Sequence, residues 1–141
     1  MRILSAFLLL LIALPPAAIA DGEDGPAAEV ETLARSTSSW DGARLPDYPR
    51  GQPEVTILRI RVPAGTRLPL HHHPVINAGV LLEGELTVVG SGGSTLHLQA
   101  GDAIIEMVDT PHYGMNQGSA DAVIIVFYAG VEEKPITVTE P

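Results

Sequence analysis

The sequence of 141 residues contains no cysteine. This absence excludes disulfide bonds, catalysis by a thiol and thiolate ligands for a metal ion. Positive charge is also scarce, since 8 Lys and Arg stand against 17 Asp and Glu, for a net charge of -9. A surface with this net negative charge repels nucleic acid and anionic membranes. We therefore expect neither as a partner. Without disulfides the fold must be held by its core alone, which suits a closed β-barrel.

The chain has no apolar run that would span a bilayer comfortably. Its N-terminal apolar run, residues 3–14, is short and is broken by Pro15-Pro16. Residues 18–20 then read Ala-Ile-Ala, the small-x-small pattern that a signal peptidase cleaves. We therefore expect residues 1–20 to be a cleaved signal peptide, a mature chain beginning at Asp21, and a periplasmic or secreted location. The alternative is a membrane anchor; no integral membrane segment is expected after cleavage.

The mature chain is predicted to be one domain behind a short leader. Residues 21–29 are acidic and rich in Gly, Pro and Ala, which is typical of a mobile leader. The remaining length, residues 30–141, is that of a single domain. Residues 29–40 mix apolar positions at helical spacing with a run of Ser and Thr, and we interpret them as an edge strand.

From residue 54 onward the pattern is that of short β-strands. Residues 54–62 alternate in side-chain character, and residues 122–128 form the most apolar strand. Glu83-Gly84-Glu85, between two apolar runs, predicts a hairpin. Gly and Pro separate the strands and no convincing helix is present, so we expect an all-β sandwich or barrel.

Histidines are concentrated in the middle of the chain. In an extended strand His71 and His73 share one face while His72 takes the other. Two imidazoles on one face make half of a metal site, which needs a third ligand from another strand. His112, just after the apolar run 103–108, is the best candidate. The alternative is a polar loop that repeats one residue type.

These residues belong to two motifs that resemble those of the cupin superfamily. The first consists of Gly65, five residues, His71-x-His73, a ligand position at 77 and Gly84; the second consists of Gly101-Asp102, His112 and Asn116. The resemblance covers roughly residues 54–130. It implies a cupin-type jelly roll, or double-stranded β-helix barrel, in a small single-domain exported member. The chain departs from the family pattern at Asn77, usually Glu, and at Met107 and Asp109, usually Pro and Gly.

Three further residues are candidates for the site. Asn77 is either a fourth, neutral metal ligand or a group that only forms hydrogen bonds across the barrel. Glu106 lies on the solvated outer face or inside the cavity, where it would act as a base or orient a ligand histidine. Tyr113, beside His112, is the preferred phenol donor, with Tyr128 as the second choice. Arg59, Arg61 and Arg67 would meet an anionic substrate at the mouth or, as such charges commonly do, lie in solvent.

The resemblance implies one divalent transition metal ion (Fe, Mn, Ni, Zn or Cu) bound by His71, His73, His112 and Asn77. Superfamily members with three-histidine iron sites are dioxygenases, so oxidation of a small organic acid or phenol is the most concrete function. A second hypothesis is a non-catalytic module that binds a metal or small ligand. A third is a barrel without metal, stabilised by its core and by homodimer formation. Fold does not decide whether the protein is an enzyme.

Overall fold

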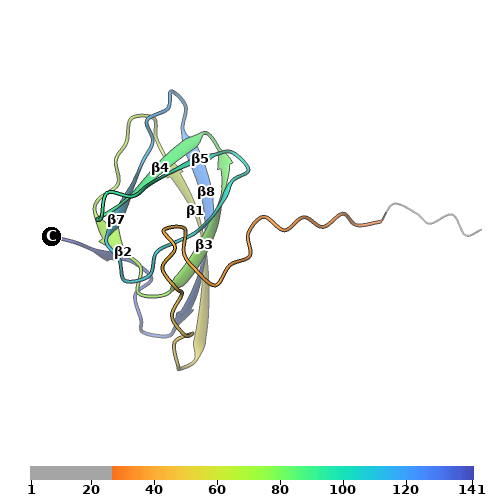
Figure 1. Ribbon diagram of the computed structural model, residues 1–141, viewed down its shortest axis with the longest axis vertical. Coiled ribbons are helices and arrows are strands. Elements are labelled where there is room, and N and C mark those ends of the chain that lie inside the picture. Colours follow the sequence, from red (N-terminus) through yellow and green to blue (C-terminus); the bar gives the residue numbers. More distant parts are fainter. Residues whose placement is uncertain (1–26) are drawn as a thin grey trace, which may run out of the picture. The chain divides into compact units, whose positions relative to one another are not determined.

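The structure is a computed structural model and describes residues 27–141. The expected signal peptide and most of the expected leader, residues 1–26, lie outside the described residues. Glu31–Pro141 form one compact unit (Figure 1). Within the described range no helix is long and apolar enough to cross a membrane.

Residues 27–141 contain β-strands and no helix. The strands are β1 (Pro53–Val62), β2 (His71–His72), β3 (Ile76–Glu83), β4 (Glu85–Gly90), β5 (Thr95–Gln99), β6 (Ala103–Ile105), β7 (His112–Met115), β8 (Ala122–Val131) and β9 (Val138–Thr139). The all-β fold expected from the sequence is confirmed.

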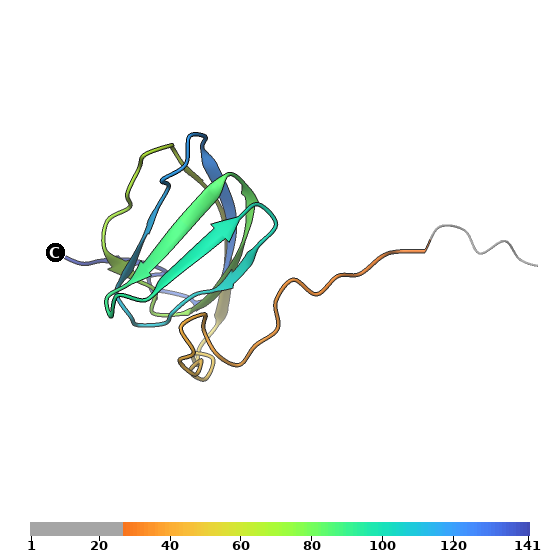
Figure 2. The same ribbon diagram turned by 45° about the horizontal axis from the view of Figure 1, so that its top comes forward.

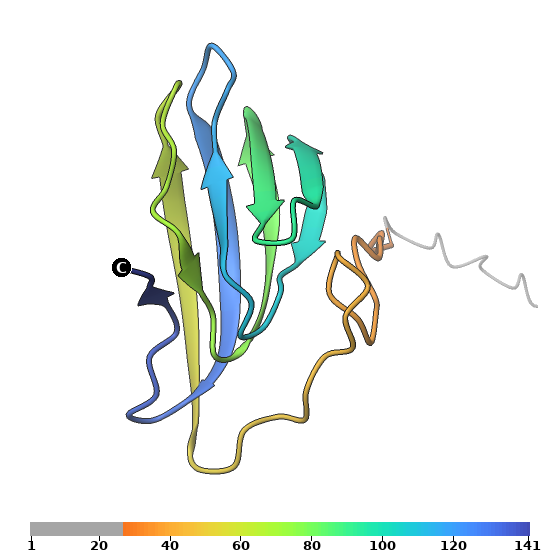
Figure 3. The same ribbon diagram turned by 60° about the vertical axis from the view of Figure 1, so that its left-hand side comes forward.

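The strands form two sheets, each paired antiparallel. One sheet has the order β1-β8-β3-β6 and the other the order β5-β4-β7-β2-β9. Figure 2 shows the β4–β5 hairpin in green in front of β8 in blue, and Figure 3 shows β1 in yellow running beside β8. Most neighbours within a sheet are distant in sequence, as in a jelly roll. The arrangement brings β2 and β7 together, and these two strands carry His71 and His112.

The alternation of β1 decides which side chains enter the space between the sheets. Leu58, Ile60 and Val62 face inward, whereas Arg59 and Arg61 take the opposite face of the strand. Buried aliphatic residues from both sheets complete the core, and each contributes about 1.5–3 kcal/mol by leaving water. This inward face also lines a cavity that the core does not fill.

Two local predictions were wrong. Glu83-Gly84-Glu85 is not a hairpin turn, because β3 and β4 belong to different sheets and the chain crosses between them there. Gly84 has φ +73, and a Cβ atom at this position would lie 2.5 Å from the backbone oxygen of Asp121. Glycine is therefore needed for the crossing itself, and the hydrophobic runs on either side do not indicate pairing.

The edge strand expected at residues 29–40 is also absent. Between residues 27 and 52 the structure has only a single β-bridge, which joins Ser38 and Arg44. Trp40 anchors the segment, since its backbone N–H donates to the oxygen of Ile105 at 2.9 Å and its ring packs against the core. The side chains of Ser36 and Ser39 form local turn hydrogen bonds there, which compete with a strand ladder.

Candidate metal centre

Three histidines from two strand regions meet at one end of the cavity. His71 on β2 is paired directly with His112 on β7, and His73 follows β2 in a bridge with Val108. Each of the three offers a ring nitrogen, and these atoms lie within 4.8 Å of one another. The ring centroids are 4.7–5.1 Å apart. The structure thus brings together the three histidines that the sequence singled out.

Backbone oxygens fix which nitrogen of each ring is free. The Nδ1 atom of His71 lies 2.8 Å from the oxygen of Pro69, and the Nδ1 atoms of His73 and His112 lie 2.8 Å from the oxygens of Ile136 and Thr110. A carbonyl oxygen only accepts, so each Nδ1 carries the proton. In the neutral imidazole each Nε2 therefore keeps its lone pair, as a metal-ligating imidazole requires.

Glu106 directs its carboxylate to the same place. Its Oε2 atom lies 3.2 Å from Nε2 of His112, and both atoms are buried without a hydrogen-bond partner. The distance is that of an ion pair, and no hydrogen bond joins the two atoms, because the neutral His112 ring donates from Nδ1 and has no proton on Nε2. Two acceptors facing each other in a buried site repel unless a cation lies near both. The residues present therefore fit a metal ion.

The electrostatic environment keeps one imidazole neutral and favours charge on another. Burial lowers the pKa of His73 to about 4, against the opposing effects of the Ile136 carbonyl and Glu106. Burial also acts to lower the pKa of His112, but the adjacent Glu106 carboxylate and the Thr110 carbonyl outweigh it, so this pKa is raised. Glu106 thus favours a positive charge at His112, whether that charge is a proton or an ion bound by the histidines.

Asn77 and Glu106 are direct neighbours across the β3–β6 pair. The backbone N–H of Glu106 donates to the backbone oxygen of Asn77 at 3.1 Å, and Tyr128 lies opposite Asn77 on β8. The three side chains therefore form a row across the sheet, all directed inward. Glu106 and Tyr128 line the cavity, whereas Asn77 is not among its lining residues, although its Oδ1 is buried without a partner. On β3, Asn77 thus stands where the family usually has a glutamate, and the neighbouring Glu106 supplies a carboxylate from across the strand pair.

The structure places Tyr113 and His72 outside this site. Tyr113 alternates with the inward-facing His112 and Gly114, and the Arg67 guanidinium lies 3.8 Å from the centre of its ring. His72 turns away from the cavity and pairs with Glu140. His72 thus points away from the cavity, as strand alternation predicts. Tyr113 lies outside the cavity, although its proximity to His112 in the chain favoured a position inside.

Tyr128 takes the position in the cavity expected for a phenol. Its side chain is buried, and burial, aided by the charge of Glu106 and opposed by a hydrogen bond from Thr137, raises its pKa to about 12. It is therefore a neutral hydrogen-bond donor at physiological pH. The C-terminal segment adds Thr137 and Thr139 to the lining, and no sequence signal pointed to either.

Asp109 explains how the second motif tolerates its departure from the family pattern. The residue has φ +54, a left-handed conformation that glycine adopts most easily. Aspartate is among the few other residues that enter this region at low cost. The loop before His112 therefore keeps the backbone path that a glycine would give.

Comparison with known proteins agrees with this geometry. The family model described as "Cupin domain" matches residues 58–128. No curated protein matches the sequence. Among solved structures, the chain is similar to a DMSP lyase from Ruegeria pomeroyi, with 24% identity and a TM-score of 0.54 over 60% of this chain and 42% of that one. It is similar to an oxalate oxidase bound to the substrate analogue glycolate, with 25% identity and a TM-score of 0.52 over 60% and 45%.

A third structure is closer to this chain in length. It is a protein with a double-stranded β-helix domain from Klebsiella pneumoniae, with 20% identity and a TM-score of 0.54 over 67% of this chain and 91% of that one. The chain spans less than half of the lyase and of the oxidase. The family match covers half of the chain and includes the three histidines and Glu106. The chain therefore belongs to the cupin family.

Proposed function

We propose that this protein is an exported cupin that binds one divalent transition metal ion and acts on a small organic molecule. Nε2 of His71, His73 and His112 would hold the ion, and the Glu106 carboxylate would be the fourth ligand in preference to Asn77. The observation that carries the proposal is the set of three Nδ1 atoms bonded to backbone oxygens, which leaves three lone pairs converging beside a buried carboxylate. The metal remains unspecified among Fe, Mn, Ni, Zn and Cu.

The chain's own groups support a catalytic role over a purely binding one. A divalent ion at this position would act as a Lewis acid on a coordinated oxygen. With one carboxylate oxygen on the ion, Glu106 would accept a proton from a bound group with the other, and Tyr128, held neutral, can donate a hydrogen bond to an oxygen in the cavity. A non-catalytic binding module would need only the histidines. Among similar structures, an oxalate oxidase supports oxidation, and dioxygenase-like chemistry is the most concrete form of the proposal.

Metal analysis of a matched histidine series tests the proposal. We expect His71→Ala, His73→Ala and His112→Ala each to abolish most binding in a competitive titration with a chromogenic chelator. His72→Ala is the control, because its ring pairs with Glu140 outside the site and the same residue type is removed. Elemental analysis of protein from its native compartment then identifies the ion. Equal losses from all four changes, or no bound metal in the wild type, would refute the proposal.

Export is the second part of the proposal and rests on the sequence pattern alone. The signal peptide 1–20 would leave a mature protein beginning at Asp21, with residues 21–29 as a leader before the cupin domain at 30–141. Mass spectrometry of the protein recovered outside the cytoplasm checks the cleavage site. Retention of Met1 in that fraction would rule out cleavage.

A further inference from the structure

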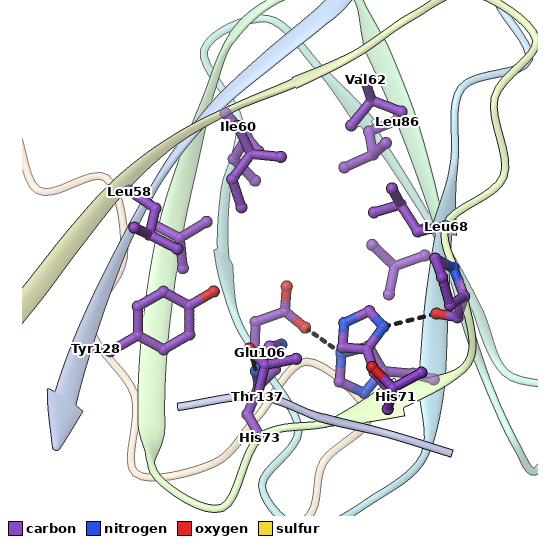
Figure 4. A pocket seen from close by; sticks show the side chains of 17 residues that line it. Leu58, Ile60, Val62, Leu68, His71, His73, Leu86, Glu106, Tyr128 and Thr137 are labelled. Carbon is purple, nitrogen blue, oxygen red and sulfur yellow. Dashed lines mark hydrogen bonds and ion pairs between the residues drawn. The ribbon is translucent and has the colours of Figure 1, made fainter. Parts of the chain in front are cut away.

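The cavity above the histidines has one polar end and one apolar end. Its volume is about 240 Å³. Figure 4 shows His71, His73, Glu106 and Thr137 together at one end, and the aliphatic side chains of Ile60, Val62 and Leu86 at the other. A ligand that fills this space must therefore present a polar group to the histidines and an apolar body to the sheets.

Among residues 27–141, no arginine or lysine lines the cavity. Arg59 and Arg61 face away from it on β1, and Arg61 pairs with Asp121 in solvent. Arg67 lies over the ring of Tyr113 on the outside. Within the described part of the chain, Glu106 is the one acidic residue that lines the cavity. A dianion would find no cation except a bound metal ion, and its second charge would stay unpaired in an apolar space.

The volume limits the size of the ligand. A cavity of about 150 Å³ lined by aliphatic and aromatic side chains accommodates benzene. At about 240 Å³, this cavity has room for one six-membered ring and a small substituent. The hydroxyl groups of Tyr128, Thr137 and Thr139 are the neutral donors that line the cavity and are available to its polar group.

From these observations we infer that the substrate is a small uncharged molecule with an apolar body about the size of one substituted ring and a single polar group at the histidine end. This inference rests on the proposed function, since it names the substrate class for the same site. It separates this protein from the oxalate oxidase to which it is similar, since a small dicarboxylate lacks an apolar body. The arginines, considered from the sequence for an anionic substrate, have no part in binding it.

A homologous probe series tests the inference by binding alone. The probes are phenol, 4-methylphenol and 4-ethylphenol, all uncharged at neutral pH, with oxalate as the dianionic comparison. Isothermal titration calorimetry is carried out on the metal-loaded and the chelator-treated protein. We expect affinity to rise about fourfold with each added carbon, because each buries one more methylene against the aliphatic end. The increments should persist without metal, whereas oxalate should bind more weakly than 4-ethylphenol in both forms.

A matched pair of tryptophan variants on β1 provides the control. Ile60→Trp fills the apolar end, while Ile57→Trp adds the same ring on the outer face, where the native side chain is 64% exposed. We expect at least a tenfold loss of 4-ethylphenol affinity in Ile60→Trp and no change in Ile57→Trp, with metal affinity unchanged in both. If Ile60→Trp does not fold, Val88→Phe fills the same cavity from β4.

The outcomes separate the two proposals. A flat phenol series, tighter binding of oxalate, or equal affinity in the two tryptophan variants would overturn the substrate class while leaving the metal site intact. If the wild-type protein bound no metal but its affinity still rose with each added carbon of the phenol series, the proposed function would be overturned and the apolar binding site retained. In that case the cavity is a metal-independent receptor for the same class of molecule.

Discussion

The Oε2 atom of Glu106 lies 3.2 Å from Nε2 of His112, and each atom is buried with no hydrogen-bond partner among residues 27–141. His112 already donates from Nδ1 to Thr110, so its Nε2 presents a lone pair to a carboxylate. Such a pair is unstable without a positive charge nearby. Glu106 is therefore the carboxylate that a cation bound by the three histidines would meet.

Removal of the Glu106 charge should weaken metal binding. Glu106→Gln keeps the size of the side chain and replaces an anionic oxygen by a neutral one, so we expect divalent metal affinity to fall about 10–100-fold. Competitive titration with a chelator at one pH measures the change. Glu54→Gln on β1 is the control, since it removes the same charge from an exposed position and should leave affinity unchanged. Equal affinities in the two variants would show that Glu106 does not act on the ion.

The metal-free protein should lose stability as the pH falls from about 6.5 to about 4. The pKa of His73 is near 4 in the folded protein and 6.5 in the unfolded chain, so the unfolded chain binds the extra proton across this window. The loss amounts to about 3 kcal/mol from this residue. The pKa of His112 is raised on folding, so the stability that this residue contributes is fully present below pH 6.5. It therefore adds no change in stability between pH 6.5 and pH 4.

Urea unfolding of chelator-treated protein at several pH values measures this loss. His73→Gln is the comparison, because it keeps the carboxylates and their common pH response but removes the titrating imidazole. We expect the stability of the wild type relative to the variant to rise by about 3 kcal/mol from pH 4 to pH 7. Parallel curves over the whole range would contradict the assignment of a depressed pKa to His73.

Strand positions were largely predictable, because alternation and Gly or Pro punctuation are local signals. Residues 54–62 alternate over a whole strand, and the structure places β1 at Pro53–Val62. The same alternation placed His71 and His73 on one face and His72 on the other. The sequence could not assign a sheet to each strand, so the sheet crossing at Gly84 was mistaken for a hairpin.

The direction of Glu106 was unpredictable for a related reason. Residues 103–108 are apolar at positions on both faces, so alternation does not reveal which face is inside. Pairing with β3 decides it, since Ala78 opposite Ile105 sets Glu106 opposite Asn77. Tyr128 likewise reaches the site across the sheet from a distant part of the sequence. Proximity along the chain favoured Tyr113, which alternation turns outward.

Gly84 should tolerate substitution much less well than Gly65. Both have φ +73, so alanine costs about 1–3 kcal/mol of backbone strain at either position. At Gly84 the new Cβ atom would also lie 2.5 Å from the Asp121 oxygen, whereas nothing lies within 4 Å at Gly65. We expect Gly84→Ala to be about 1–3 kcal/mol less stable than Gly65→Ala in urea unfolding. Equal losses would mean that the chain relaxes freely at the sheet crossing.

The row formed by Tyr128, Asn77 and Glu106 permits a test of where the carboxylate can stand. Asn77 occupies the family's usual glutamate position, and Glu106 lies opposite it, directly after β6. The two inward-facing positions are adjacent, so a carboxylate placed at 77 should replace the one lost at 106. We expect Asn77→Glu, added to Glu106→Gln, to recover most of the metal affinity that the single change loses.

The control for this exchange is Asn77→Gln in the same Glu106→Gln background. Glutamine adds the same side-chain length as glutamate but no charge, so this variant should recover no metal affinity. Any cost of overpacking at this fully buried position, about 1–3 kcal/mol, is common to both double variants. Chelator competition measures affinity, and urea unfolding of the metal-free proteins measures the packing cost. Recovery in both double variants would trace the effect to packing. Recovery in neither, with both folded, would mean that position 77 does not reach the ion and that a carboxylate acts only from position 106.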